Sequence, residues 1–374
     1  MKRILVALAF VLAAWANADA YLIVPTSRGA NLPLCLEGIG VAKDNGYDGV
    51  IFGAGTLNIP NVSDNGVHRI EQAASYADYR IALREVFKKG LKAHVRLGVG
   101  WSGSGSVRPF RPDPWAWPYI ARIWTQTKNY TDVEAKAAGI SGSSRVTFEL
   151  CNEPGLAGAN GPQFGYWSTA RIYYDRWKKY GDKADWLKAF PDSLFGKPEG
   201  YIEPEFGTMM WNIRRQASFG GYKTFGVNFE GDWEAEFLSI QGADWQNFFS
   251  WCHGYSLNRY GGDARSVWFY ENGKWGKRPA TPDEMAQRWA ENVAKKLGWA
   301  KAMPVLQDAR FLTMVCEAGF FDGYAATGWT PNDYRQAIIR KGKSFPNLKG
   351  AGLFTYKATD PLGTGYEVGA GVIP

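Results

Sequence analysis

The chain has 374 residues, 45% of them hydrophobic, and carries a formal net charge of +7. This length fits one barrel-sized domain, and the basic residues are spread along the chain without the basic and aromatic alternation typical of nucleic-acid binding. Only three histidines occur, and no group of His, Cys and acidic residues has metal-ligand spacing, so we predict no metal and no cofactor.

The N-terminal segment has the organisation of a secretory signal peptide. Two basic residues precede an apolar run from Ile4 to Trp15, and Ala18-Asp19-Ala20 fits a small-residue cleavage site. A membrane anchor or a buried N-terminal helix is the alternative, but the run is short for a bilayer span. We therefore expect a signal peptide over residues 1–20, secretion or export to the periplasm, and a single catalytic domain over residues 21–374.

Beyond this segment, apolar runs that end in Gly, Asn or charged residues alternate with helical patterns. The predicted strands lie near Tyr21–Thr26, Tyr47–Phe52, Leu91–Leu97, Arg145–Cys151, Tyr222–Phe229, Asn247–His253, Phe311–Glu317 and Gly350–Tyr356. The predicted helices lie near Leu34–Asn45, Ser75–Lys89, Trp115–Ala138, Glu203–Phe219, Trp233–Trp245, Pro282–Leu297 and Pro331–Lys343. This alternation predicts an α/β fold, a (β/α)8 TIM barrel. A doubly wound open sheet is the alternative, but no Gly-rich phosphate loop follows the first strand.

Two long insertions interrupt the alternation, after strands 4 and 6. Residues 155–202 contain an extra helical pattern near Ser168–Lys188, rich in Trp, Tyr and Arg. Residues 259–280 contain Asn272-Gly273 between apolar segments, which is a hairpin signal. Because both insertions follow strands, we expect both to emerge on the catalytic face as walls or lids. The C-terminal residues show no clear eighth helix.

The four cysteines are Cys35, Cys151, Cys252 and Cys316. Disulfides are common in exported proteins, but strand cysteines packed in a barrel usually behave as small hydrophobic residues. We therefore favour buried thiols over disulfides.

Two predicted strands end in glutamates. The segment RVTFELCNEPG reads as a buried strand that ends in Asn152-Glu153-Pro154, where the proline keeps Glu153 extended. The segment RFLTMVCEAGF ends in a second glutamate, Glu317. Two carboxylates at the ends of separate strands form the minimal apparatus for glycoside hydrolysis.

The sixth predicted strand carries a further polar pair. In SWCHGYSLNRY, His253 and Tyr255 are two residues apart, which places both on one face of an extended chain. The order Asn-Glu, then His-x-Tyr, then Glu resembles the clan A glycoside hydrolases, and most closely family 5. The similarity to this clan in residue order and strand placement spans most of the chain. The specific sequence motifs cover only the fourth, sixth and seventh predicted strands.

The resemblance implies a role for each matching residue. Glu153 would be the general acid and base, and Glu317 the nucleophile, of a retaining mechanism. Asn152 would bind the sugar 2-hydroxyl, Tyr255 would donate a hydrogen bond to Glu317, and His253 would lie in the network beside Glu153.

The chain departs from family 5 at three strand ends. The family arginine after the second strand is replaced by Phe52-Gly53-Ala54, and the third-strand histidine by Gly98-Val99-Gly100-Trp101. The eighth-strand tryptophan is replaced by Tyr356. His94 and Arg96, earlier in the third strand, are partial substitutes, with a structural barrel histidine as the alternative for His94.

Aromatic side chains supply further sugar contacts in this interpretation. Flat rings with a polar edge stack on the C–H faces of pyranose rings. We predict that Trp101, Tyr356 and Trp275 bind substrate, with ordinary packing as the alternative.

Glu149 is a competing carboxylate that the motif does not use. It lies four residues before Glu153 on the same strand face, about 13 Å back from the rim at about 3.3 Å per residue. That position is too deep for the cleaved bond, so we predict a structural role, pairing with Arg96 or His94 inside the barrel.

The sequence therefore predicts a retaining glycoside hydrolase that cleaves a β-linked polysaccharide or oligosaccharide. The resemblance implies an endo-acting β-glycanase of the cellulase or mannanase kind. We expect a monomer whose partner is its glycan substrate, with no nucleic acid and no membrane after signal cleavage. The alternatives are a non-catalytic glycan-binding barrel and a transglycosylase that remodels a cell-surface polysaccharide.

Overall fold

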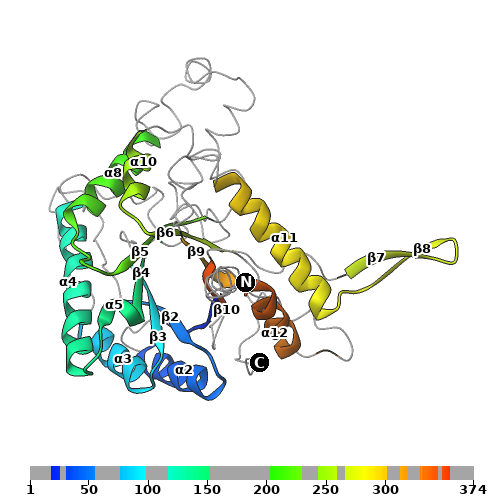
Figure 1. Cartoon of the computed structure of the whole chain (residues 1–374), viewed down its shortest axis with the longest axis horizontal. Helices are drawn as coiled ribbons and strands as arrows, with labels where there is room; N and C mark the ends of the chain where they lie inside the picture. The colour runs from blue at the N-terminus through cyan, green and yellow to red at the C-terminus, as the bar shows by residue number, and fades with distance from the viewer. Residues whose placement is uncertain are drawn as a thin grey trace, which may run out of the picture.

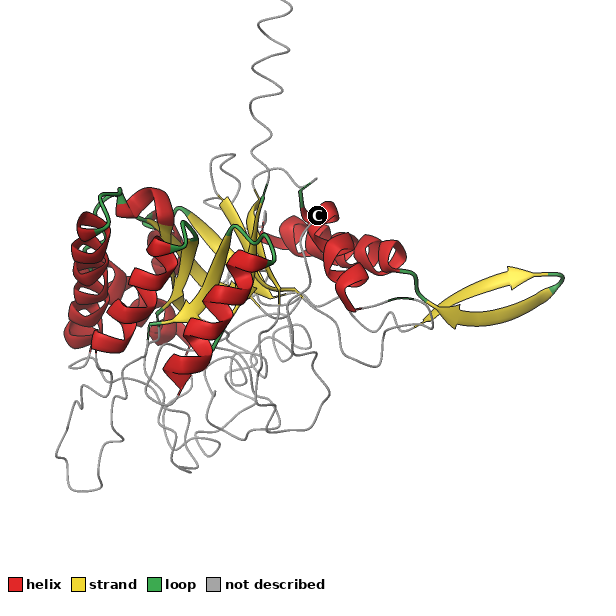
Figure 2. Cartoon of the chain, turned by 90° about the horizontal axis from the view of Figure 1, so that it is seen from below, coloured by secondary structure: helices red, strands yellow, loops and turns green. Residues whose placement is uncertain are grey.

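The computed structural model describes residues 18–25, 31–54, 76–97, 117–151, 203–229, 243–258, 266–300, 312–318, 329, 331–343 and 348–353. Within these ranges, eight strands form a closed barrel in the order β1-β10-β9-β6-β5-β4-β3-β2. Every neighbouring pair in the barrel is parallel. Helices cover the outside of the barrel (Figure 1, Figure 2). The predicted TIM barrel is confirmed, and the open-sheet alternative is excluded.

The barrel strands are β1 (Asp19–Ile23), β2 (Gly49–Gly53), β3 (Lys92–Arg96), β4 (Val146–Cys151), β5 (Lys223–Phe229), β6 (Gly254–Asn258), β9 (Leu312–Ala318) and β10 (Leu348–Leu353). A separate antiparallel hairpin consists of β7 (Ser266–Glu271) and β8 (Lys274–Pro279). The helices are α2 (Leu32–Asp44), α3 (Tyr76–Lys88), α4 (Trp117–Ala137), α5 (Gly142–Arg145), α8 (Glu203–Gln216), α10 (Ala243–Ser250), α11 (Pro282–Ala300) and α12 (Pro331–Gly342). No helix in the described ranges is long and apolar enough to cross a bilayer.

Seven predicted strands overlap the observed ones, but the predicted strand Asn247–His253 is wrong. Asn247 belongs to α10, and β6 begins only at Gly254. A short apolar run such as FFSWC fits a helix as well as a strand. The helix allows the adjacent Phe248 and Phe249 both to be buried in the core around the barrel, where neighbouring strand residues would point to opposite faces. Of the predicted helix Trp233–Trp245, residues 243–245 belong to α10, and residues 233–242 lie outside the described residues.

Two hydrophobic cores hold the fold together. The larger one lies between the strands and the surrounding helices, and the smaller one fills the barrel with Tyr21, Ile23, Ile51, Phe225 and Met314. Large rings inside the barrel require small neighbours, because a β-carbon added at Gly350 would lie 2.6 Å from the Tyr21 ring. The combination of a large ring on one strand and a glycine on its neighbour therefore fixes which strand faces pack into the barrel.

The thiols of Cys35 and Cys252 are buried and free, as the sequence predicted for them. Burial raises the pKa of both thiols to about 12, so they are unreactive packing groups. Cys252 lies in the turn after α10 and not in a strand. The side chains of Cys151 and Cys316, the predicted insertion over 155–202 and the residues after Leu353 lie outside the described residues.

The start of the helix α11 follows its sequence signal. Thr281 precedes the helix, and its Oγ1 accepts a hydrogen bond from the backbone N of Glu284 at 3.3 Å. In return, Glu284 Oε2 accepts a hydrogen bond from the backbone N of Thr281 at 2.9 Å. This reciprocal capping box fixes the point at which the hairpin β7–β8 joins the helix. Arg278 of the hairpin donates to the same carboxylate, at 2.5 and 2.7 Å.

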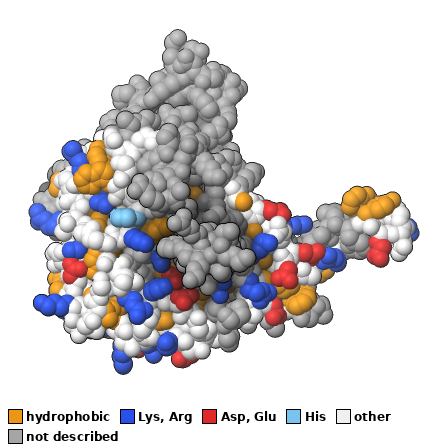
Figure 3. Space-filling model, viewed as in Figure 1, with side chains coloured by type: hydrophobic (Ala, Val, Ile, Leu, Met, Phe, Trp, Pro, Cys, Tyr) orange, Lys and Arg blue, Asp and Glu red, His pale blue; other side chains and the backbone are white. Residues whose placement is uncertain are grey.

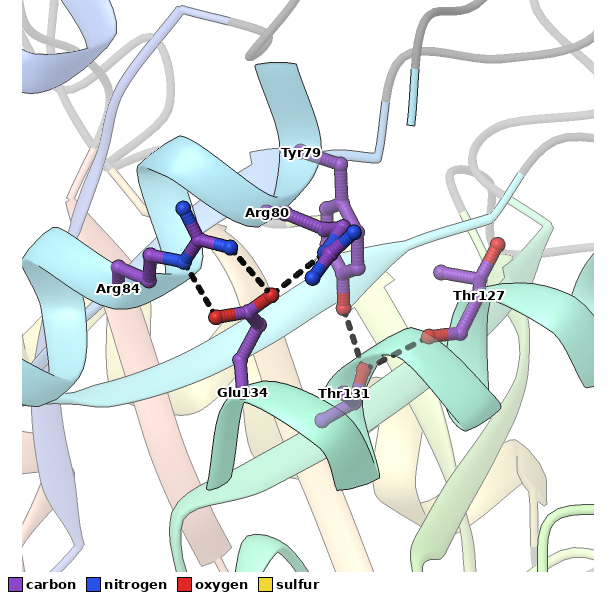
Figure 4. Close-up of polar contacts among 6 residues, drawn as sticks. All are labelled: Tyr79, Arg80, Arg84, Thr127, Thr131 and Glu134. Atoms are coloured by element: carbon purple, nitrogen blue, oxygen red, sulfur yellow. Dashed lines mark hydrogen bonds and ion pairs between the residues drawn. The ribbon is translucent and has the colours of Figure 1, made fainter. Parts of the chain in front are cut away.

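A buried carboxylate joins α3 to α4 (Figure 4). Glu134 on α4 is 2% exposed and accepts hydrogen bonds from Arg84 and, at 2.5 Å, from Nε of Arg80. Beside it, the Tyr79 hydroxyl and Thr131 Oγ1 lie 2.7 Å apart. The hydrogen bonds from Arg84 lower the pKa of Glu134, against the opposing effect of burial, and Arg80 lowers it further. The two helices are thus held by charged hydrogen bonds as well as by apolar packing.

We predict that Glu134→Gln lowers the free energy of unfolding by about 2 kcal/mol near neutral pH. This is less than the loss of about 3–5 kcal/mol for fully buried ion pairs, because both arginines are partly exposed. The pKa of Glu134 is depressed in the fold, so its contribution is present above the unfolded pKa of about 4.3 and is lost as pH falls through the lower folded value. Urea unfolding at several pH values measures this difference.

The matched control is Glu85→Gln, because Glu85 on α3 makes surface pairs with Lys89 at 3.4 Å and with Lys88 at 3.8 Å. It should change the free energy of unfolding by about 0.5 kcal/mol or less. Equal effects of the two substitutions would contradict the role assigned to Glu134.

Candidate active site

Of the two predicted catalytic glutamates, Glu317 belongs to the end of β9, and Glu153 comes two residues after the end of β4 in the sequence. Glu317 is the penultimate residue of β9, and Cys151 is the last residue of β4, so Asn152-Glu153 follows that strand directly. In a closed parallel barrel the carboxyl ends of all strands meet at one rim, which is where TIM-barrel active sites lie. Asn152, Glu153 and the Glu317 side chain lie outside the described residues. The carboxyl ends of β4 and β9 therefore lie at the same rim.

The structure corrects the predicted position of Tyr255. In the register of β6 with β9, Tyr255 pairs with Thr313, four residues before Glu317 and roughly 13 Å away along the strand. A β-carbon added at Gly254 would lie 2.8 Å from the Phe225 ring inside the barrel, so Gly254 faces inward. Tyr255 accordingly faces outward and is buried, 4% exposed, in the core beneath the helices. The predicted hydrogen bond from Tyr255 to Glu317 is wrong for this geometry.

His253 also lies at the wrong end of the strand for the predicted role. It precedes β6 at the amino end of the barrel, where its backbone N donates to Thr224 O at 2.8 Å and its carbonyl accepts from Leu312 N at 2.9 Å. Its Nδ1 accepts a hydrogen bond from the backbone N of Thr224 at 3.2 Å. Burial, followed by the charges of Arg214 and Lys223, lowers its pKa. The prediction that His253 binds substrate beside Glu153 is therefore wrong, and the misplaced sixth strand is the reason.

The register identifies a different residue beside Glu317. Asn258, the last residue of β6, pairs with Glu317 across the two strands. Asn258 is not among the predicted site residues, although it ends the segment YSLN that follows Gly254. With β6 placed correctly, a polar residue at its carboxyl end would have been the signal.

A polar cluster fills the barrel beneath this rim. His94 and Glu149 are both 0% exposed, and His94 Nε2 lies 3.3 Å from Glu149 Oε2. His94 Nδ1 lies 2.7 Å from Thr147 Oγ1, and Arg96 Nε lies 3.6 Å from Glu149 Oε1. The predicted structural role of Glu149, paired with Arg96 and His94, is confirmed. His94 is likewise the structural barrel histidine given as the alternative.

Burial dominates the electrostatics of His94. It lowers the pKa of the imidazole, while the hydrogen bond and the charge of Glu149 act in the opposite direction and the charges of Arg96 and Lys349 lower it further. The ring also meets Phe225 edge-on, with centroids 5.4 Å apart. A neutral His94 thus fits the interior both by packing and by hydrogen bonding.

The hairpin that carries Trp275 stands away from the barrel (Figure 1, Figure 2). Its turn is the predicted one, with Asn272 and Gly273 at φ 52° and 74°. Tyr270 and Trp275 are 62% and 70% exposed, and their ring centroids are 5.2 Å apart. Figure 3 shows exposed hydrophobic side chains on this hairpin. The expectation that the hairpin stands over the catalytic face as a wall or lid does not fit this arrangement, because β7 and β8 extend away from the barrel strands (Figure 1). The substrate contact of Trp275 stays a prediction.

The other predicted substrate-binding residues, Trp101 and Tyr356, lie outside the described residues. Among the residues that the structure describes, no group of three or more His, Cys, Asp or Glu side chains could hold a metal ion.

No family model matches the chain, and no curated protein matches it. Solved structures similar to the chain include a monomeric β-xylosidase from Caulobacter crescentus CB15, with 14% identity, a TM-score of 0.46, and coverage of 93% of this chain and 64% of that one. A β-mannanase from Thermomonospora fusca has 12% identity, a TM-score of 0.44, and coverage of 93% and 82%. An endo-1,4-β-D-mannanase from Thermotoga petrophila RKU-1 has 12% identity, a TM-score of 0.42, and coverage of 94% and 92%.

These likenesses are distant, and the chain spans less than two thirds of the length of the xylosidase. All three proteins are glycosidases by name. The assignment of this chain to clan A and to family 5 stays a prediction. The barrel topology of this chain rests on its own strand pairing.

We predict that stability falls as pH is lowered from about 6.5 toward about 5.5, and that His94→Gln makes this dependence flatter. The pKa of His94 is depressed in the fold, so the unfolded chain binds the proton first and each step toward lower pH favours unfolding. One such group contributes at most about 1.4 kcal/mol per pH unit to the free energy of unfolding.

Urea unfolding across this window measures the slope, with His253→Gln as the control. The pKa of His253 is lowered as well, but its side chain is exposed, so His253→Gln should flatten the slope less than His94→Gln does. A slope in His94→Gln as steep as in the unmodified chain would contradict the assignment.

Proposed function

We propose that the protein is a retaining glycoside hydrolase that cleaves a β-linked polysaccharide or oligosaccharide, with endo action. The observation that carries this proposal is the closed parallel barrel in which Glu317 lies at the carboxyl end of β9 and β4 leads directly into Asn152-Glu153. Two carboxyl groups at one rim are what double displacement needs.

In the proposed mechanism the two glutamates begin in different protonation states. Glu153 protonates the leaving oxygen while ionised Glu317 attacks the anomeric carbon and forms a covalent glycosyl-enzyme. Formation of this ester removes the negative charge of Glu317, which lowers the proton affinity of Glu153. Glu153 then takes a proton from water, and the water displaces Glu317 with net retention. Asn152 binds the sugar 2-hydroxyl.

The barrel interior supports this choice of acid. Glu149 is the other carboxylate on β4, but its oxygens face His94 and Arg96 in a site with 0% exposure. A carboxylate held in that way cannot reach a glycosidic oxygen above the rim. Glu153 is therefore the group that β4 offers for proton transfer.

We further propose that the protein is exported and acts as a monomer. The N-terminal basic residues and the apolar run Ile4–Trp15 support export. Cell fractionation with intact-mass measurement tests export, and light scattering tests the oligomeric state.

A screen of purified protein against defined β-linked polysaccharides, with product sizing, tests the activity. Short oligosaccharides released by the unmodified chain and absent with Glu317→Gln support the hydrolase. Binding without turnover on the whole panel would indicate a glycan-binding barrel. Products that lengthen when acceptor sugars are added would indicate transglycosylation.

We predict that Glu317→Gln abolishes turnover on every substrate, because both half-reactions pass through its carboxylate. Glu153→Ala should slow substrates with poor leaving groups far more than activated aryl glycosides, since only the former need protonation. Steady-state kinetics on matched pairs of substrates measure this contrast.

The control for this pair is Glu149→Gln. It changes a carboxylate of β4 that we place outside the chemistry, so its effect on kcat should not depend on the leaving group. Identical behaviour of Glu153→Ala and Glu317→Gln on both substrate classes would show that the roles are misassigned.

We predict that Trp275→Ala weakens use of long polymers and leaves small aryl glycosides nearly unaffected. The exposed Tyr270 and Trp275 rings are placed to stack on sugars remote from the cleaved bond. The loss in kcat/KM on polymer should be about 1–3 kcal/mol, the range for stacking of a base on an aromatic side chain.

A matched control is Trp251→Ala, because Trp251 is also exposed, at 48%, but precedes β6 at the opposite end of the barrel. Trp251→Ala should change kcat/KM to the same extent on long polymers and on small aryl glycosides. If Trp275→Ala reduced both classes equally and lowered the melting temperature, the tryptophan would only stabilise the hairpin.

A further inference from the structure

Asp19, the first residue of β1, is the centre of an ion-pair cluster at the amino end of the barrel. Its Oδ1 accepts a hydrogen bond from Lys92 Nζ on β3 at 2.5 Å, and its Oδ2 accepts one from Lys349 Nζ on β10 at 2.8 Å. The Tyr21 hydroxyl donates to Oδ2 at 3.2 Å. One carboxylate, 8% exposed as a residue, therefore connects three strands of the barrel.

The charge of Asp19 fits this position. Burial by itself raises the pKa of the carboxyl group, but the hydrogen bonds and charges of Lys349 and Lys92 bring it below its ordinary value. Without Asp19, both ammonium groups would lose the carboxylate that they share at the amino end of the barrel. Loss of one partner from such a pair is more damaging than loss of the whole pair.

The next residue, Ala20, is also part of the barrel. It is 0% exposed, its backbone N donates to Asp48 Oδ2 at 2.8 Å, and its carbonyl accepts from Asp48 N at 2.9 Å. Asp19 and Ala20 pair with Gly350 and Ala351 on β10. A mature chain that began at Tyr21 would lack the first two residues of β1 and the whole Asp19 cluster.

Between residues 14 and 20 the sequence offers three cleavage frames, because alanine occupies positions 14, 16, 18 and 20. The frame Ala18-Asp19-Ala20 removes the residues just described. The frame Ala14-Trp15-Ala16 lies within the end of the apolar run and leaves no polar segment before the cut. The frame Ala16-Asn17-Ala18 keeps the apolar run intact and preserves β1. Among the described residues, cleavage in this frame removes only Ala18, whose side chain is a single methyl group.

We propose that a signal peptidase cleaves between Ala18 and Asp19, so that the mature protein begins at Asp19. Water adds across the Ala18–Asp19 peptide bond, leaving a carboxylate on Ala18 and an ammonium group on Asp19. The new positive charge is on Asp19, whose own carboxylate is negative, and the next backbone N, of Ala20, donates to Asp48 Oδ2 at 2.8 Å. These carboxylates limit the repulsion from Lys92 and Lys349. The proposal rests on the proposed export of the protein and not on its glycosidase activity.

Intact-mass measurement and N-terminal sequencing of the full chain, expressed in a bacterium with a Sec signal peptidase, test the site. The expected mass is that of residues 19–374. A mature N-terminus at Asn17 or at Tyr21, or an uncut chain, would overturn the proposal. These results are independent of any glycan assay.

Ala16→Leu tests the frame itself. It places a large residue at the −3 position of the proposed site and leaves the Ala18-Asp19-Ala20 frame untouched. Processing at Asp19 should fall by at least about tenfold, whereas Ala13→Leu within the apolar run should process normally. Unchanged processing at Asp19 in Ala16→Leu would contradict the proposed site.

The structural reason is tested with Asp19→Asn in the mature protein. The melting temperature should fall by about 5 °C or more, because both lysines lose the carboxylate charge of Asp19. The control Asp44→Asn changes an exposed aspartate near the end of α2 and should shift it by about 1 °C or less. Equal falls in melting temperature for Asp19→Asn and Asp44→Asn would contradict the structural reason for keeping Asp19 in the mature chain.

Discussion

Closure of the sheet between β1 and β10 is the constraint on which the rest of the structure depends. Asp19 to Leu22 pair in parallel with Gly350 to Leu353, while the other edge of β1 pairs with β2. Tyr21 fills the barrel beside Gly350, and Asp19 connects β1 to lysines on β3 and β10. Because the sheet closes with all strands parallel, every strand delivers its carboxyl end to one rim. The proposed function requires that geometry.

The polar interior separates structural from chemical carboxylates. Glu149 is held by His94 and Arg96 below the rim, and Glu134 is held by two arginines outside the barrel. Such buried pairs are poor evidence of stability by themselves, yet removal of one partner is damaging. The same strand, β4, thus carries a glutamate that organises the interior, and the chain continues from its end to Glu153, the proposed acid.

Most of the barrel could be predicted from the sequence because each strand is a short apolar run followed by a helical pattern. The role of Glu149 was predictable as well, since an even offset and the rise per residue fix its face and depth. The sixth strand was not predictable by the same reasoning. Phe248 and Phe249 are buried by a helix, which an apolar run of that length does not reveal. That one error moved His253 and Tyr255 to the wrong end of the barrel.

Two further differences arise from tertiary structure. The Asn272-Gly273 turn was predictable from local backbone preference, but the direction of the hairpin depends on its junction with α11 through Arg278 and Glu284. The start of β1 depends on Lys92 and Lys349, which are far from Asp19 in the sequence. Local patterns carry no information on such contacts, so the predicted boundary at residue 20 differs from the observed strand.

The proposed function requires that Glu153 and Glu317 lie close together as the carboxyl pair of a retaining glycosidase. A crystal structure of the mature protein would measure the separation of the two carboxyl groups directly. The account predicts about 5–5.5 Å, the spacing at which one carboxylate attacks the sugar while the other protonates the leaving group. A separation of about 6.5–9.5 Å would leave room for an attacking water and would contradict the retaining mechanism.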